Sequence, residues 1–313
     1  MNAIYWKELA DHFGRRRFLL LLGLVAIGTL WGVYVTTQAV QGGTGSLDQF
    51  LFLDIFTSGS GVLPSLLFFI SFFGPLIGIA LGFDAVNSER THGTLSRILA
   101  QPVYRDAVIN GKFLAGVTAL AVVIVSMELA IIGLGMFILG FAPRGEEIVR
   151  IVGFTLVSIA YLAFWLALAT TASVFLRNTV ASALVTLGIW LFSGFIILLL
   201  ANVAADYFAP LSSNAADAAR NFSIQTWISR VSPGFLFQEA TQTLLDPLTS
   251  RSQQPLDLIF SLSPERLEGL LLTPISAAES LKLVWPHIVA LITGVAILFT
   301  GAYAKFMREE IRS

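Results

Sequence analysis

Cysteine is absent from this chain, and histidine occurs three times among 313 residues. The absence of cysteine excludes disulfide frameworks, thiolate metal sites and cysteine nucleophiles. Charged residues are also sparse, at 12% of the chain, against about 25% in soluble domains. Because 56% of the residues are hydrophobic, one aqueous core cannot bury them, and we expect lipid to solvate much of the chain.

The sequence also lacks the usual motifs of enzymes. His-Glu-x-x-His and Gly-x-Ser-x-Gly do not occur. Gly111-Lys112 has no glycine five residues before it, so it is not a phosphate-binding loop. The net charge of −1 provides no global field that would attract nucleic acid. We therefore expect that the chain is not an enzyme, holds no cofactor or metal itself and has no nucleic-acid partner.

Six apolar runs are long enough to cross a bilayer as helices, which takes about 20 residues each. They cover residues 18–40, 62–83, 113–141, 148–175, 179–203 and 283–303. Short turns at Pro143 and at Arg177 make antiparallel hairpins of the third, fourth and fifth runs. We predict an all-α integral membrane protein with six transmembrane helices in a single domain, residues 1–313.

The second run carries a glycine at every fourth position, at Gly74, Gly78 and Gly82. These small residues would share one helix face and let a neighbouring helix approach closely. The neighbour could belong to the same subunit or to a second copy.

Residues 1–17 precede the first run and predict an amphipathic helix in the membrane interface. Tyr5, Leu9 and Phe13 recur every four residues, whereas Lys7, Glu8 and Asp11 lie off this stripe. A short frayed leader with accidental periodicity is the alternative. Three arginines then adjoin the first span.

The orientation follows from the lysines and arginines of the short loops and tails, which concentrate on the cytoplasmic side. One side has two, Arg144 and Arg150. The other has twelve: Lys7, Arg15, Arg16, Arg17, Arg90, Arg97, Arg105, Lys112, Arg177, Lys305, Arg308 and Arg312. We expect a multi-pass protein of the cell membrane with both termini and residues 84–112 in the cytoplasm.

The outer loop, residues 202–282, is too long to be a plain connector, and we expect it to fold into helices. Ser232-Pro233 is typical of a helix start, with proline at the first helical position. The apolar stretch 235–245 would dip into the membrane or pack over the bundle. Pro264 begins another predicted short helix.

Residues 84–112 are the one regular polar block between apolar runs. Gly93 breaks the helix that leaves the second span, Thr94 can cap a new helix, and Pro102 ends it. Leu95, Ile98 and Leu99 would share one face of this short helix. A helix of this kind, lying parallel to the membrane, predicts a docking surface.

The residues of this block carry a resemblance to a known family. They read Glu89-Arg90-Thr91-His92-Gly93-Thr94-Leu95, then Leu99-Ala100-Gln101-Pro102-Val103-Tyr104-Arg105, then Gly111-Lys112. This pattern resembles the cytoplasmic signature of type-2 ABC (ATP-binding cassette) export permeases. The resemblance is close over about thirty residues, and the six-span layout extends it loosely to the whole chain.

The resemblance implies a coupling helix that sits in a cleft of a separate ATP-binding subunit. Glu89 and Arg90 would hold the end of the second span in register, and Leu95, Ile98 and Leu99 would be buried against the partner. Arg105 and Lys112 would anchor the exit through acidic groups of the partner or lipid phosphates, unless they are ordinary cytoplasmic charges.

The same resemblance implies that ATP and Mg are bound by the partner, that two permease copies pair, as a homodimer or with a related permease, and that lipid surrounds them. The expected function is ATP-driven transport, with export as the direction. The expected cargo is a lipid, a hydrophobic peptide or a drug-like molecule.

Glu128 lies within the third span, roughly 22 Å along the helix from Phe113. A carboxyl at this depth is costly unless it is paired or neutral, which makes Glu128 a candidate for substrate binding or gating. The alternative is a protonated acid bonded to a serine or threonine of the bundle. A proton-coupled secondary transporter using Glu128, or a non-transporting membrane scaffold, remains an alternative function.

Overall fold

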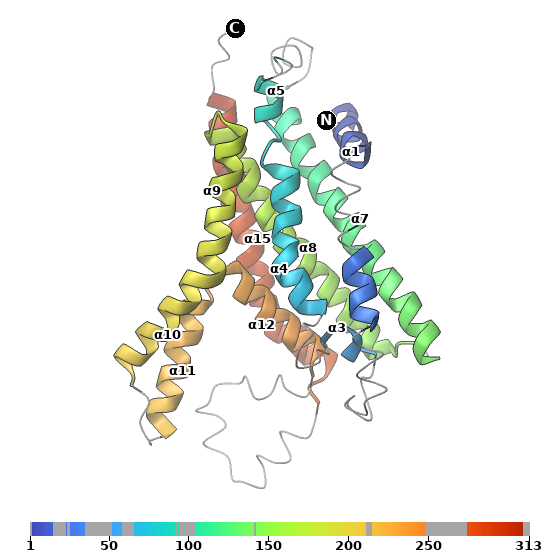
Figure 1. Cartoon of the computed structure of the whole chain (residues 1–313), viewed down its shortest axis with the longest axis vertical. Coiled ribbons are helices and arrows are strands. Elements are labelled where there is room, and N and C mark those ends of the chain that lie inside the picture. Colours follow the sequence, from blue (N-terminus) through green and yellow to red (C-terminus); the bar gives the residue numbers. More distant parts are fainter. Residues whose placement is uncertain are drawn as a thin grey trace.

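The computed structural model describes residues 2–14, 23, 26–34, 52–57, 66–91, 93, 104–140, 142–210, 215–247 and 274–308. The regular structure within these ranges is helical throughout. Figure 1 shows a bundle of long helices with α1 and α5 at one end, together with the C-terminal end of α15. The all-α membrane class predicted from the sequence is confirmed.

Five helical stretches of the described part are long and apolar enough to cross a membrane: 67–91, 105–137, 145–175, 179–208 and 277–308. They correspond to the predicted second to sixth spans. The predicted first span, 18–40, falls mostly outside the described residues, although residues 26–34 within it are helical.

Helix α8 (Gly145–Phe175) is the centre of the bundle. It packs against α4 (Leu66–Gly82), α7 (Arg105–Leu139), α12 (Pro233–Leu245) and α15 (Ala277–Arg308). Its apolar window is 67% buried, against 11% for that of α15.

The glycine stripe of α4 packs on α8. A Cβ at Gly78 would lie 2.7 Å from the carbonyl oxygen of Leu162, and one at Gly82 would lie 2.8 Å from that of Leu166. Both gaps are too short for a side chain, so glycine is what allows the two backbones to approach. The sequence left open whether this face packs on the same subunit or on a second copy. In the structure it packs on α8 of the same subunit.

The fifth span is interrupted by a π-helix. Helix α9 (Thr179–Leu191) continues through η1 (Phe192–Ile196) into α10 (Ile197–Phe208), so the helix extends beyond the predicted end at 203. A π-turn adds one residue to the helical repeat and disturbs its direction. Figure 1 shows α10 paired with α11 (Ala215–Ser229) and leaning away from the bundle.

Helix α12 and the short helix α3 (Asp54–Thr57) lie towards the end of the bundle opposite α5 (Figure 1). α12 begins where the sequence predicted, because Ser232 is the N-cap, its side chain accepts from the Phe235 N–H, and Pro233 follows. The helix packs over the bundle, against α4, α8 and α15. α3 lies beside α4 and α12. The helix predicted at Pro264 lies outside the described residues.

Arg150 differs most from its expected setting. The charge count treated it as a loop residue, but it lies on α8 and is 0% exposed. Its guanidinium donates to the carbonyl oxygen of Leu244 and the hydroxyl of Ser280, both at 2.9 Å, and to the carbonyl oxygen of Ile275. Arg150 thereby fastens the end of α12 and the start of α15 to α8.

Candidate functional site

The polar block of the sequence is described in part. Glu89, Arg90, Gly93, Arg105 and Lys112 belong to the described residues. The other candidates, on the predicted docking helix, lie outside them: Thr94, Leu95, Ile98, Leu99 and Pro102. The described members occupy the two stems of this segment, α5 (Asn87–Thr91) after α4 and the first turns of α7.

The stem after α4 is tied to the end of α8. The hydroxyl of Ser173 accepts from the backbone N–H of Val86 at 3.1 Å and of Asn87 at 3.2 Å. Arg90 donates to the carbonyl oxygens of Ser173 at 3.3 Å and Val174 at 3.1 Å. An arginine on the last carbonyls of a helix satisfies groups that have no partner within that helix. These contacts suit the register role that the resemblance implied for Arg90, which stays a prediction.

Lys112 joins three elements through buried ion pairs. Its ammonium lies 2.7 Å from Oε1 of Glu89 on α5 and 2.9 Å from Oε1 of Glu8 on α1 (Asn2–Gly14). The three side chains are between 7% and 10% exposed. We call Glu8, Glu89 and Lys112 the ionic junction. The acidic groups that contact Lys112 in the described structure therefore belong to this chain, not to a partner.

Glu8 was missed by the sequence reasoning, which placed it off the apolar stripe of α1. Helix α1 lies along α7 and turns Glu8 inwards, with 7% of it exposed. The available signal was Ile4, one helical turn before Glu8 and so on the same face. Gly111 favours this approach, because a Cβ there would lie 3.0 Å from Cγ2 of Ile4, a tight contact that would push the side chain of Ile4 away.

The pKa of Glu8 is lowered from its ordinary value of 4.5. Burial alone would raise the pKa of this carboxyl, but the charge and hydrogen bond of Lys112, with a smaller contribution from Lys7, outweigh that effect. Lys7 lies 3.2 Å from the same oxygen and is 56% exposed. The folded chain therefore favours a charged Glu8.

Gly93 and Arg105 sit at the two edges of the docking segment. Gly93 has a φ of 64°, the left-handed region that glycine adopts at no steric cost. Its predicted role as a helix break is consistent with this conformation. Arg105 is the first residue of α7, and its anchoring role stays a prediction.

Glu128 lies deep in α7 and is 4% exposed. The hydroxyl of Thr155 on α8 contacts its Oε2 and also lies 2.9 Å from the carbonyl oxygen of Ile151. The buried Oε1 has no hydrogen-bond partner among the described residues. The alternative interpretation of Glu128, an acid bonded to a serine or threonine of the bundle, predicts a contact of this kind.

The described ranges contain no cluster of side chains that could bind a metal ion. They contain no group of three or more histidine, cysteine, aspartate or glutamate residues placed to hold an ion. The acidic residues that do cluster, at the ionic junction, are already paired with lysine.

A family model and two relatives all relate this chain to membrane proteins of ABC transporters. A family model described as ABC-2 family transporter protein matches residues 2–311. A relative from Pseudomonas aeruginosa, named probable ABC transporter permease protein NosY, is 30% identical over 199 residues, which are 59% of this chain and 64% of that protein. A protein of the same name from Stutzerimonas stutzeri is 33% identical over 123 residues, 38% of this chain and 40% of its own length. The matched region thus spans less than two thirds of either relative.

Proposed function

Since this chain belongs to the ABC-2 family of transporter proteins, we propose that it is the membrane permease of an ATP-driven exporter. ATP and Mg are bound by a separate ATP-binding subunit, which docks on the segment between α5 and α7. The chain itself performs no hydrolysis. Its part is to convert a movement of the docked subunit into a movement of the membrane helices.

The ionic junction is the observation that carries this proposal. It lies where both stems of the docking segment meet α1, so a displacement of α5 acts directly on Lys112 and, through it, on α7 and Glu8. Arg90 extends the connection to the end of α8, the most buried of the candidate spans. A movement of the docking segment would therefore act on α8, at the centre of the bundle.

The distribution of charge supports cytoplasmic termini. α1, α5 and the end of α15 lie together at one end of the bundle (Figure 1), and Lys7, Arg90, Lys305 and Arg308 are on them. Arg144 precedes α8 at the opposite end. The outer helices α11 and α12 then face away from the ATP-binding subunit.

A second copy of the permease completes the membrane part of the proposed transporter. The window from α9 to α10 is only 11% buried within one chain. We assign the face of α9 and α10 to a second copy and the remaining apolar surface to lipid. A pathway between two such bundles suits a lipid, a hydrophobic peptide or a drug-like cargo.

Assembly tests the proposal directly. The tagged permease is co-expressed with the ATP-binding subunit encoded in the same organism and purified through the tag. The variant with both Leu95→Asp and Leu99→Asp would bury two charges in the contact, and we expect recovery of the ATP-binding subunit to fall at least about tenfold.

Val231→Asp is the matched control, because Val231 is 69% exposed in the turn before α12, and α12 lies apart from α5 in Figure 1. It should leave recovery unchanged. Normal recovery with the double variant would overturn the docking surface. A wild-type chain that recovers no ATP-binding subunit would instead favour a membrane scaffold.

Glu128 is our candidate for gating or cargo binding. It joins α7 to α8 through Thr155, and its carboxyl is 4% exposed, a costly position for an acid within a membrane span. In the reconstituted complex we expect Glu128→Gln to change cargo-stimulated ATP hydrolysis by at least about threefold. Equal stimulation in both proteins would assign Glu128 a purely structural role. Transport driven by a proton gradient without ATP would favour a secondary transporter.

A further inference from the structure

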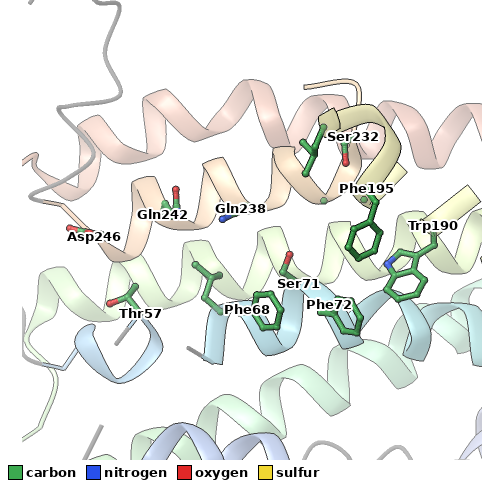
Figure 2. A pocket seen from close by; sticks show the side chains of 14 residues that line it. Thr57, Phe68, Ser71, Phe72, Trp190, Phe195, Ser232, Gln238, Gln242 and Asp246 are labelled. Carbon is green, nitrogen blue, oxygen red and sulfur yellow. The ribbon is translucent and has the colours of Figure 1, made fainter. Parts of the chain in front are cut away.

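A cavity of about 550 Å³ opens between α4, the π-helix region and α12, well apart from the ionic junction. Its volume falls in the range of small-molecule sites, roughly 300–1,000 Å³. Figure 2 shows two unlike walls, with α12 on one side and α4 facing it, and with Trp190 and Phe195 closing one end.

The wall formed by α4 and the π-helix region is aromatic. Phe68 and Phe72 lie one turn apart on α4, and Phe72 meets Trp190 edge to face, with ring centroids 5.1 Å apart. Phe195 of η1 completes this end. Large rigid rings of this kind contribute apolar contact area and geometric selection. This part of the cavity suits the apolar portion of a ligand.

The wall formed by α12 is polar along its length. Gln238, Gln242 and Asp246 recur every four residues, so they share one face of the helix. They extend over about 12 Å at the rise of an α-helix. In Figure 2, Asp246 and Gln242 lie towards the end of the cavity opposite Trp190. The two ends therefore differ in chemistry.

The charge of the cavity wall is negative. Asp246 is its one charged residue among the described residues, and the wall includes no lysine or arginine. Asp246 is also the C-cap of α12, where the helix dipole places partial negative charge. Both features favour a cation and disfavour a phosphate or carboxylate.

The basic side chains that the structure describes near α12 have partners outside the lining of this cavity. Arg230 donates to both carboxylate oxygens of Glu239, at 2.6 and 2.9 Å, and lines an adjoining cavity of about 240 Å³ that shares Gln238 and Gln242 with this one. Arg150 reaches the carbonyl oxygen of Leu244 from the α8 side and is fully buried. His287 contacts Glu239, not the cavity wall.

We propose that this cavity binds a cationic amphiphile, with its positive group at Asp246 and its apolar part between Phe68, Phe72 and Trp190. The site rests on the proposed function in that the bound molecule would be the cargo. It narrows the cargo class by charge, because anionic lipids and other anionic amphiphiles are disfavoured. Binding itself requires no ATP-binding subunit.

The test uses the full-length permease in phosphatidylcholine nanodiscs. Three chain-matched photoreactive alkyl probes differ in their polar end, which is trimethylammonium, its uncharged tert-butyl isostere or sulfonate. Labelled peptides are located by mass spectrometry as the probe concentration is varied. We expect labelling of α4 and α12, with half-saturation for the ammonium probe about tenfold below that for the sulfonate.

The variant Asp246→Asn should raise half-saturation for the ammonium probe about tenfold and leave the uncharged probe unchanged. Asp246→Glu keeps the charge and should behave like wild type. Asp217→Asn, on α11 and outside the cavity wall, is the control for removing one acidic residue. Unchanged melting temperatures show that the variants are folded.

Equal saturation by the ammonium and sulfonate probes in wild type would overturn the proposal without any variant. So would labelling confined to other helices, or an Asp246→Asn protein that keeps wild-type affinity for the ammonium. A chain that binds the ammonium probe at α4 and α12 but never recruits an ATP-binding subunit would refute the proposed function alone.

Discussion

At the scale of single residues, the Lys112 side chain joins three helices, because it pairs with Glu8 of α1 and Glu89 of α5. Two carboxylates contact its ammonium at 2.7 and 2.9 Å, and the group is only 7% exposed. Desolvating three charges is costly, and the cost is offset only while all partners are present. The net negative charge of the junction is reduced by Lys7 at its rim.

Replacing Lys112 by methionine keeps the length of the side chain and leaves two buried carboxylates facing each other. We expect Lys112→Met to destabilise the permease by about 3–5 kcal/mol, as for other buried pairs that lose one partner. The melting temperature of the purified protein in one detergent measures this loss.

The triple variant Lys112→Met, Glu8→Gln and Glu89→Gln removes all three charges at nearly constant volume. It should recover most of the lost melting temperature, since uncharged groups carry a smaller desolvation cost. If Lys112→Met alone melts like wild type, the carboxylates are solvated and the junction has no structural role.

Arg150 illustrates another limit of reading charges one residue at a time. Counting lysines and arginines assumes that each lies in water, whereas Arg150 is enclosed and donates to groups from residues 244, 275 and 280. The count for the short loops and tails still points to the same orientation without it, because Arg144 alone then opposes twelve lysines and arginines on the other side.

At the scale of elements, α1 combines two attachments. Its inner face packs on α7 through Glu8 and through Tyr5, which donates to the hydroxyl of Thr118 at 3.0 Å. Trp6 stays 64% exposed, whereas Tyr5 of the predicted apolar stripe faces α7, so a position of α1 in the membrane interface stays a prediction. The contacts that the structure shows for α1 therefore attach it to the third span.

The attachment of α1 should depend on pH through Glu8. Its folded-state pKa is below 4.5, so the unfolded chain binds the proton more readily, and the charged group stabilises the fold. This contribution is fully present above about pH 4.5 and is lost as the pH falls through the lowered folded value. We expect Glu8→Gln to melt below wild type at pH 7 and the difference to narrow below about pH 4.5.

Melting temperatures of both proteins between pH 7 and pH 3 measure this effect. Asp11→Asn is the control on the same helix, because Asp11 is 44% exposed and its pairing with Lys7 is 3.6 Å long. Its difference from wild type should be smaller at pH 7. A Glu8→Gln difference that stays constant over the whole range would contradict the linkage.

At the scale of the whole molecule, burial is unevenly shared among the spans. α8 is enclosed by its neighbours, whereas the window from α9 to α10 is 11% buried. Figure 1 shows α9 and α10 along one flank of the bundle. A symmetric dimer places the same patch of each copy on the other, and this flank can form such a patch.

The absence of cysteine makes the dimer proposal simple to test. Leu184 on α9 is 63% exposed, and we expect Leu184→Cys to give a crosslinked dimer in native membranes treated with a short bis-maleimide. Leu129→Cys is equally exposed at 63% but lies on α7, and should remain monomeric. Crosslinking at residue 129 with none at residue 184 would assign the dimer to another face.

The sequence by itself determined the class and the helices of this protein. Hydrophobic runs are local and are matched to a fixed bilayer thickness, so the second to sixth spans are visible without any contact. The left-handed Gly93 and the capped start of α12 are equally local, since each depends on neighbouring residues only.

Only the tertiary structure decided which polar groups meet. Lys112 finds Glu8 across 104 residues, and Arg150 finds Ser280 across 130. Glu128 meets Thr155 because α7 and α8 form a hairpin, and the cavity exists because α12 folds back beside α4. Buried charge is stable only beside a specific partner, and the identity of that partner is set by packing between distant segments, which no local pattern records.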